Sequence, residues 1–178
     1  MEIIVGCDLE EFRKYYEDKL GELGDTEEDI VLEDPEHLIA WREGSEILGH
    51  AIWHPSNTRR HPDGSQREGT DRRLLEELID GPGDFAELHE LWLTKEHRGK
   101  GYGETFFDFF EGFIGGRGHD TIVYYTDNPS ALAICRRRGY REAYGVELDG
   151  IDPQGDAYYI LVLDLRGRVS VKASDRKP

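Results

Sequence analysis

One glycine-rich turn and the stretch before it contain residue types suited to anion binding and proton transfer. The turn reads "HRGKGYG" at 97–103, with three glycines at alternate positions beside cationic residues. A glycine turn that opens a helix directs backbone N–H groups and the positive helix end at one point, which suits an anion. The preceding stretch, "FAELHELWL" at 85–93, carries Glu87, His89 and Glu90, side-chain types that serve as general bases. The pattern indicates an anion site beside a candidate base, although a plain strand-to-helix turn can contain the same glycines.

Two common nucleotide-binding motifs fit this turn poorly. A P-loop requires G-x-x-x-x-G-K-[ST], and the turn lacks the lysine and the hydroxyl at those places. A dinucleotide fingerprint requires G-x-G-x-x-G, and here the third glycine, Gly103, comes one residue too soon. The spacing therefore excludes the first motif and gives little support to the second.

The pattern around the turn predicts a mixed α/β domain. After the turn, apolar residues recur at helical spacing, which indicates a buried helix face rather than a cofactor site. These residues are Phe106, Phe109, Phe110, Phe113 and Ile114. We expect one domain at 1–165, an insertion at 54–84 between the third and fourth strands, and a polar tail at 166–178. The expected elements are a strand at 2–6, a helix at 8–23, a turn-rich piece at 24–29, a hairpin at 36–54, a short helix at 71–79, a strand at 85–94, a helix ending at Gly115 and Gly116, a strand at 121–125, a helix at 128–139, and strands at 141–148 and 157–165.

Charge and composition narrow the classes of function. The 178 residues carry a formal net charge of -16, which repels phosphate backbones, so we expect no nucleic-acid partner. No apolar run approaches the ~18 residues of a membrane helix, so we expect no membrane partner and a cytoplasmic protein. The 2 cysteines exclude a disulfide framework, and no histidine spacing suggests a ligand set, so we expect no metal. We expect a monomer or a homodimer.

Two motifs, taken in order, resemble one family. "RGKGYG", Arg98 to Gly103, matches [QR]-x-x-G-x-[GA], and "NPSALAICRRRGY", Asn128 to Tyr140, is similar to N-x-x-A-x-x-L-Y-x-x-x-G-F. Both patterns at this spacing resemble the GNAT superfamily of acyl-CoA-dependent N-acyltransferases. The resemblance covers about residues 85–165, while 1–54 agree only in the order of elements. It implies the GNAT fold, an α/β fold with a mixed, mostly antiparallel six- to seven-stranded sheet and helices on both faces.

The resemblance implies how coenzyme A is held. In the family, the pyrophosphate lies on the backbone amides of the glycine turn, and the start of the helix lies nearby. The pantetheine arm pairs with the preceding strand, which here means Leu91 and Leu93. Asn128 would hydrogen-bond the same arm, and it also suits the N-cap of the helix that follows. The implied pyrophosphate residues are Gly99, Lys100, Gly101, Tyr102 and Gly103, with Glu104 and Thr105 nearby. Arg98 is a further candidate for a contact with the phosphates of the coenzyme.

The resemblance also implies a general base on the strand at 85–93. Glu87 is the first candidate, because "FAE" is similar to the tripeptide that carries the base in the histone acetyltransferase branch. Glu90 and His89 are further candidates, and a water chain is an alternative to all three. The backbone N–H of Leu91 would stabilise the oxyanion. Strand alternation predicts one face with Glu87, His89, Leu91 and Leu93 and another with Leu88, Glu90 and Trp92.

The second motif departs from the family at Cys135, where many members carry a tyrosine that protonates the departing thiolate. A cysteine on a helix is most often a small buried apolar residue, so Tyr140, Tyr102 or water could act instead. The arginines at 136–138 suit the C-terminus of a helix, and they could also contact the phosphates of coenzyme A. The acid step is therefore left open.

The motifs together predict an N-acetyltransferase. We expect it to transfer an acetyl group from acetyl-CoA, its cosubstrate, to a primary amine of a small molecule or protein. The amine would attack directly in a ternary complex. A non-catalytic acyl-CoA-binding module is the main alternative, and transfer of a longer acyl group, or to a hydroxyl, is a weaker one. The sequence does not identify the acceptor.

Overall fold

Seven strands and five α-helices make up the part of the chain that the computed structural model describes, residues 2–59, 68–144 and 159–166. The strands are β1 (Glu2–Val5), β2 (Leu38–Glu43), β3 (Glu46–Asn57), β4 (Asp84–Leu93), β5 (Thr121–Thr126), β6 (Arg141–Tyr144) and β7 (Tyr159–Asp164). The helices are α1 (Leu9–Lys19), α2 (Asp25–Glu33), α3 (Glu68–Ile79), α4 (Tyr102–Gly116) and α5 (Pro129–Arg137). Two short 3-10 helices, η1 (Pro35–His37) and η2 (Lys95–His97), precede β2 and α4.

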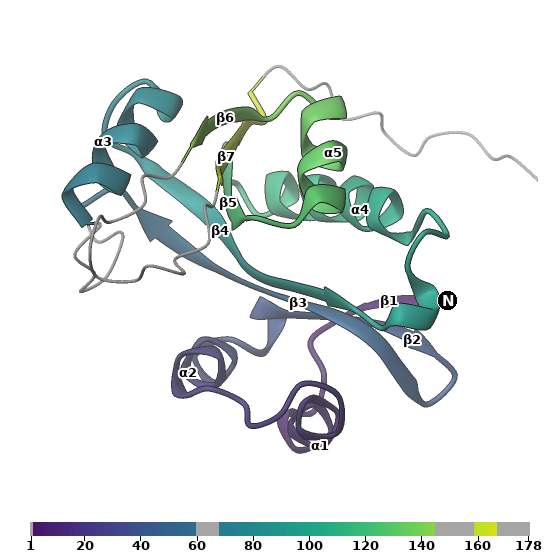
Figure 1. The fold of residues 1–178 in the computed structure, drawn as a ribbon. Helices are drawn as coiled ribbons and strands as arrows, with labels where there is room; N and C mark the ends of the chain where they lie inside the picture. The colour runs from purple at the N-terminus through teal and green to yellow at the C-terminus, as the bar shows by residue number, and fades with distance from the viewer. Residues whose placement is uncertain (1, 60–67, 145–158, 167–178) are drawn as a thin grey trace, which may run out of the picture.

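The strands form one mixed sheet in the order β1-β2-β3-β4-β5-β7-β6. β4 and β5 run parallel, and the other described neighbours are antiparallel. Helices α4 and α5 cover one face of the sheet, while α1 and α2 cover the other (Figure 1). The expected fold, with its mostly antiparallel sheet and helices on both faces, is confirmed. None of the described helices is both long and apolar enough to cross a membrane.

The core lies on both faces of the sheet. Under α4 and α5, Phe106, Phe110 and Ile114 are fully buried and pack with Trp41 of β2, so the expected apolar face of this helix is confirmed. On the opposite face, Phe12 of α1 is fully buried in a second cluster with residues of α2, β2 and β3. The chain thus buries apolar side chains on both faces of the sheet, and this close packing fixes the positions of the central strands.

Three sequence expectations need correction. The sequence predicts a turn-rich piece at 24–29, but α2 begins at Asp25, where acidic residues in the first turn suit the positive end of a helix. The expected insertion began at residue 54, but β3 continues to Asn57 and pairs with β4 throughout. The short helix expected at 71–79 begins three residues earlier, at Glu68. The stretch between the last two expected strands, and all of the expected tail at 166–178 except its first residue, lie outside the described residues.

The central strands β4 and β5 separate part-way along their length. Their paired residues run from Ala86 opposite Ile122 to Leu88 opposite Tyr124. Beyond Leu88, β4 continues for five residues, to Leu93, along β3 alone. Where the parallel pair β4 and β5 separates, the edge of β4 that faces β5 has no partner strand, so its backbone groups are exposed. The opening creates the space for a ligand between two adjacent strands.

A β-bulge lies in β4 at the same place. Ile52 of β3 is opposite Glu90, whereas the next residue, Trp53, is opposite Leu88, so His89 is the extra residue on β4. A bulge changes the alternation of side chains. Strict alternation predicts that Leu88 and Leu91 lie on opposite faces of the strand. Both pack against the core under α4, so the predicted alternation is wrong across the bulge. His89 and Glu90 instead contact the helices of the other face, as described below.

Candidate active site

A cavity of about 420 Å³ lies where β4 and β5 separate. Its walls come from both strands, from the glycine turn at the start of α4, and from α5. Six residues predicted to bind coenzyme A line it: Leu91, Leu93, Arg98, Gly99, Gly103 and Asn128. Sequence reasoning missed the aromatic and aliphatic part of the wall, which is formed by Trp41, Phe107, Tyr124 and Ile134. These six are thus brought together around one opening, whereas five other predicted residues are not among those that line it: Lys100, Gly101, Tyr102, Glu104 and Thr105.

The glycine turn has a backbone that requires glycine. Gly99 and Gly101 have φ angles of 74° and 84°, in the left-handed region. Gly101 is the N-cap of α4, and the first helical hydrogen bond runs from the N–H of Thr105 to the Gly101 carbonyl at 3.2 Å. The amides that precede Thr105 lie at the open end of the helix, where N–H groups have no partner within the helix. This end can bind an anion through backbone N–H groups and the helix dipole.

Contacts at the end of β4 hold the turn in place. The Nε atom of Arg98 donates a hydrogen bond to the Leu93 carbonyl at 2.9 Å, and its guanidinium lies 6.0 Å from the Trp92 ring centroid. His97 lies 2.7 Å from the Thr94 hydroxyl through Nδ1. These bonds fix the turn relative to the strand edge that opens toward the cavity.

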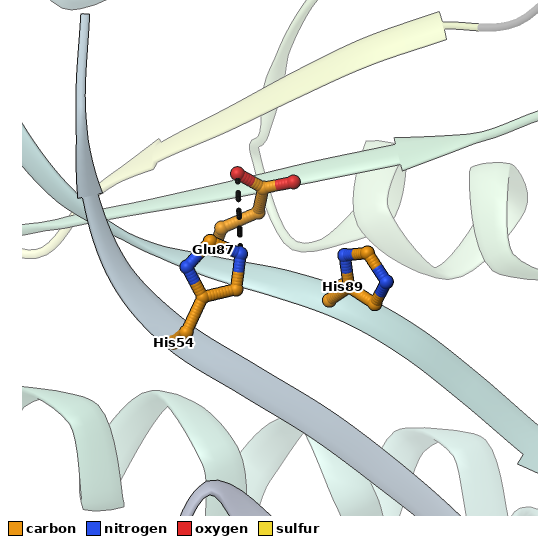
Figure 2. Close-up of side chains that lie close together, drawn as sticks. All are labelled: His54, Glu87 and His89. Carbon is orange, nitrogen blue, oxygen red and sulfur yellow. Dashed lines mark ion pairs between the residues drawn. The ribbon is translucent and has the colours of Figure 1, made fainter. Parts of the chain in front are cut away.

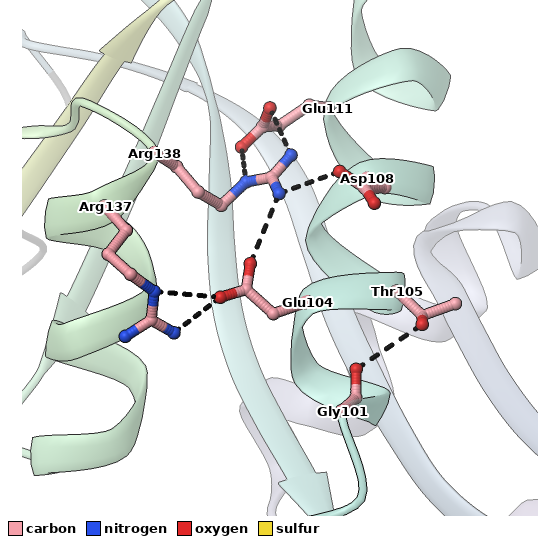
Figure 3. Close-up of polar contacts among 7 residues, drawn as sticks. All are labelled: Gly101, Glu104, Thr105, Asp108, Glu111, Arg137 and Arg138. Atoms are coloured by element: carbon pink, nitrogen blue, oxygen red, sulfur yellow. Dashed lines mark hydrogen bonds and ion pairs between the residues drawn. The ribbon is translucent and has the colours of Figure 1, made fainter.

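The arginines at the end of α5 bind to α4. Arg137 pairs with Glu104 at 2.5 Å, and Arg138 donates to Glu111 at 2.7 and 2.9 Å (Figure 3). Arg138 also lies 2.8 Å from Asp108. The hydrogen bond from Arg137 lowers the pKa of the Glu104 carboxyl. These pairs join the helices on either side of the cavity, so Arg137 and Arg138 are engaged by carboxylates rather than held ready for phosphate.

Asn128 caps α5 as its sequence position suggested. Its side-chain oxygen accepts hydrogen bonds from the N–H groups of Ser130 at 2.9 Å and Ala131 at 3.2 Å. The residue also lines the cavity. Since the oxygen is used by the cap, the side-chain NH₂ group is the part that can reach a ligand.

Glu90 is at the centre of a polar group on the α1 face of the sheet. One carboxylate oxygen lies 3.2 Å from Nε2 of His50, which is fully buried, and the Tyr16 hydroxyl donates to the same oxygen at 3.2 Å. Tyr15 contacts the other ring nitrogen of His50 at 3.2 Å. Burial opposes ionisation of Glu90, but the contacts with His50 and Tyr16 prevail and lower the pKa of its carboxyl. Glu90 is therefore a carboxylate at neutral pH.

Glu87 and His89 lie near His54 on this same face. His54 of β3 is paired opposite Glu87, and its Nε2 atom lies 3.7 Å from a Glu87 oxygen (Figure 2). His89 is 2.9 Å from Glu27 of α2 through Nε2. Burial lowers the pKa of His54, although the Glu87 carboxylate opposes this effect. The three base candidates predicted on β4 thus fall into two groups, one around Glu90 and one around Glu87.

Tyr124 lines the cavity, whereas Cys135 lies in the core. Cys135 is fully buried in the core under α4 and α5, where burial raises the pKa of its thiol to about 12. Tyr124 of β5 lines the cavity next to the end of the β4–β5 pairing, and burial raises its pKa to about 12. Sequence reasoning named Tyr140 and Tyr102 as alternatives, and it missed Tyr124 because no motif pointed to β5. Tyr140 is buried in the same core as Cys135.

A family model described as the acetyltransferase (GNAT) family matches residues 4–140. The chain belongs to this family. The match covers both motifs and the cavity between them, so the GNAT resemblance is confirmed. The protein is accordingly assigned to the GNAT-type N-acetyltransferases.

Solved structures of GNAT enzymes share the fold. An agmatine N-acetyltransferase superposes with a TM-score of 0.66 at 14% identity, covering 92% of this chain and 100% of that one. The polyamine N-acetyltransferase of Drosophila melanogaster gives 0.64 at 14% identity, covering 92% and 100%. A chain of the NatC complex bound to Gag peptide and CoA gives 0.62 at 14% identity, covering 93% and 99%. No curated protein matches the chain by sequence.

Proposed function

We propose that this GNAT protein transfers an acetyl group from acetyl-CoA to a primary amine of a small molecule or protein, by direct attack in a ternary complex. The observation that carries the proposal is the cavity at the separation of β4 and β5, which is lined in part by the glycine turn before α4. Glu90 lies on the part of β4 that extends beyond the last β4–β5 pair. An acyl-CoA needs an anion site for its pyrophosphate and a cleft for its arm. The open end of α4 is suited to the first, and the cavity between β4 and β5 is suited to the second.

Coenzyme A binds along β4 in this proposal. Its pyrophosphate lies on the amides at Gly99 to Glu104, at the start of α4. Its pantetheine arm follows the strand edge at Leu91 and Leu93, which line the cavity beyond the last β4–β5 pair. One structural neighbour of similar fold is described as bound to CoA, which supports coenzyme A as the ligand.

Glu90 is the proposed general base, directly or through a water molecule. The amine nitrogen attacks the thioester carbonyl carbon and must lose a proton, since a free amine has a pKa of about 10. The backbone N–H of Leu91 would stabilise the oxyanion. Glu90 lies beyond the last β4–β5 pair, at the opening, whereas Glu87 lies opposite Val123 in the paired part of the sheet. Glu90 is therefore favoured over Glu87, the first candidate from sequence, and over His89, which lies in a separate group with His54 and Glu87.

Tyr124 is the proposed general acid. As the tetrahedral intermediate collapses, the carbon–sulfur bond breaks and the thiolate of coenzyme A takes a proton. Tyr124 lines the cavity and keeps its proton at neutral pH, since its pKa is raised to about 12. Cys135, at the usual tyrosine position of the family motif, is buried in the core instead.

The acceptor reaches the opening from the α1 and α2 face, where Glu90 lies. The carboxylate of Glu90 on this face suits a cationic amine. Neighbours of similar fold are named as agmatine and polyamine N-acetyltransferases, which supports an amine acceptor.

The test combines binding with turnover. Calorimetric titration of acetyl-CoA should show one site, and acetyl-CoA consumption should rise when agmatine, polyamines, arylalkylamines or short peptides are added. Binding without turnover on any of these amines would favour the non-catalytic module. Absence of acetyl-CoA binding would contradict the proposal as a whole.

A further inference from the structure

Three side chains on the α2 face of the sheet converge outside the acyl-CoA cavity. His54 of β3 and Glu87 and His89 of β4 each present one possible ligand atom, and these atoms all lie within 4.8 Å of one another. The strand register places His54 opposite Glu87, and the β-bulge adds His89 beside them. Sequence spacing did not suggest this group, because the two histidines are 35 positions apart and meet only through the β3–β4 pairing.

Each histidine in the group has its other ring nitrogen held by an acceptor. Nδ1 of His54 lies 3.2 Å from the Pro55 carbonyl, which can only accept, so the neutral ring carries its proton there and leaves Nε2 with a lone pair. Nε2 of His89 lies 2.9 Å from a Glu27 oxygen, which leaves Nδ1 with the lone pair by the same reasoning. Figure 2 shows one ring nitrogen of His89 turned toward His54 and Glu87 and the other turned away.

This arrangement is typical of histidines that bind metals. Metal-bound imidazoles almost always donate their second N–H to a carboxylate or a backbone carbonyl, which fixes the tautomer and the ring orientation. Glu27 and the Pro55 carbonyl supply one acceptor of each kind. The lone pair of His54 Nε2 also faces a Glu87 oxygen at 3.7 Å, and a cation between these two atoms would be attracted by both.

We propose that His54, Glu87 and His89 bind a divalent transition-metal ion of the zinc class. Two imidazoles and one carboxylate are a ligand set that zinc accepts, with a fourth position left for water. Ligand atoms at ~2.1 Å from a tetrahedral ion are ~3.4 Å apart, so the present separations need only small side-chain rotations. All three side chains are partly or largely buried, which limits competition from bulk water.

The site differs from the machinery proposed for acetyl transfer. Glu90, the proposed base, is held by His50 and Tyr16, while the metal group uses Glu87 and is linked to α2 through Glu27. Metal binding can therefore be measured without acetyl-CoA or an amine. Its outcome is independent of whether the proposed function is correct.

Calorimetric titration of the full chain, without a histidine tag, with zinc chloride tests the proposal. One ion per chain should bind, and His54→Gln and His89→Gln should each weaken binding by at least about 100-fold. Glu27→Gln should weaken it by about 10-fold, because it removes only the acceptor that orients His89. His97→Gln, a histidine beside the glycine turn, is the matched control and should bind as the parent does.

Cobalt(II) titration followed by visible absorption provides a second readout. The parent should develop bands of a four-coordinate site, and Glu87→Gln should change or abolish them. Circular dichroism and thermal melts establish that each variant is folded. Absence of stoichiometric zinc binding, or binding that survives both His54→Gln and His89→Gln in folded protein, overturns the proposal.

Discussion

The Oε1 atom of Glu90 lies 3.2 Å from Nε2 of His50, a fully buried histidine on the neighbouring strand. Together with the Tyr16 hydroxyl, this contact holds the carboxylate beside the opening between β4 and β5. Because the pKa of Glu90 is lowered in the folded protein, its stabilising contribution is present above the ordinary carboxyl pKa and is lost as pH falls through the lowered value. At neutral pH the group is ionised and can accept a proton.

Glu90→Gln should lower kcat by about 100-fold or more, because a general base contributes at least that factor. The amide is close in shape to the carboxylate, so the affinity for acetyl-CoA should stay within about threefold of the parent. Steady-state kinetics and calorimetric titration of acetyl-CoA would measure the two effects. Glu87→Gln is the comparison, with an expected loss below about tenfold. If Glu87→Gln causes the larger loss, the base is Glu87 and the preference for Glu90 is wrong.

Tyr124→Phe should lower kcat by about 100-fold with little change in the KM for acetyl-CoA, because it removes the proton donor and keeps the ring that lines the cavity. An acetyl donor with a leaving group of low pKa should recover most of the lost rate, since such a leaving group needs no proton. Equal losses with both donors would assign Tyr124 to packing rather than to the acid step.

Gly101→Ala should weaken the binding of acetyl-CoA by about 10-fold. Gly101 has a φ of 84°, and an L-residue there costs about 1–2 kcal/mol, which the turn can relieve by moving the amides that bind the pyrophosphate. Gly44→Ala is a matched control, since Gly44 has a φ of 61° in the β2–β3 turn, and at both glycines an added Cβ meets no atom within 4 Å. Both variants should lose similar stability, but only the first should lose affinity in calorimetry. A similar affinity for the two variants would contradict the assignment of the turn to the pyrophosphate.

The sequence predicted the parts of this structure that depend on local pattern. The glycine turn, the apolar face of α4 and the cap at Asn128 each rest on a few neighbouring residues, and all three are confirmed. Helix α2 was missed because Gly24 and the acidic residues after it are typical of turns. The packing of Val31 into the cluster around Phe12 helps to fix it as a helix.

The rest of the candidate site depends on contacts between distant segments. The bulge at His89 is set by the register of β3 against β4, and no pattern within β4 predicts it. The contact between His50 and Glu90 depends on the same register. For the same reason Tyr124 could not be chosen over Tyr140 before the separation of β4 and β5 was known.

Cys135 should affect stability at alkaline pH but not catalysis. Its thiol pKa is raised to about 12 by burial, whereas a cysteine in the unfolded chain has a pKa of about 8.5. The folded state therefore keeps the proton that the unfolded state releases. This contribution to stability is fully present below the unfolded pKa and is lost as pH rises toward the folded pKa.

Cys135→Ala removes this ionisation and should make the pH dependence of unfolding shallower. Between pH 8 and pH 10 the free energy of unfolding of the parent should fall by about 2 kcal/mol more than that of the variant, at ~1.4 kcal/mol per pH unit above the unfolded pKa. Urea titrations at the two pH values would measure the difference. At pH 7 the variant should lose about 1 kcal/mol of stability because a buried side chain is shortened, while its kcat stays within twofold of the parent. Parallel pH curves would show that the thiol is less protected than its burial indicates, and a large loss of kcat would return Cys135 to the acid step in place of Tyr124.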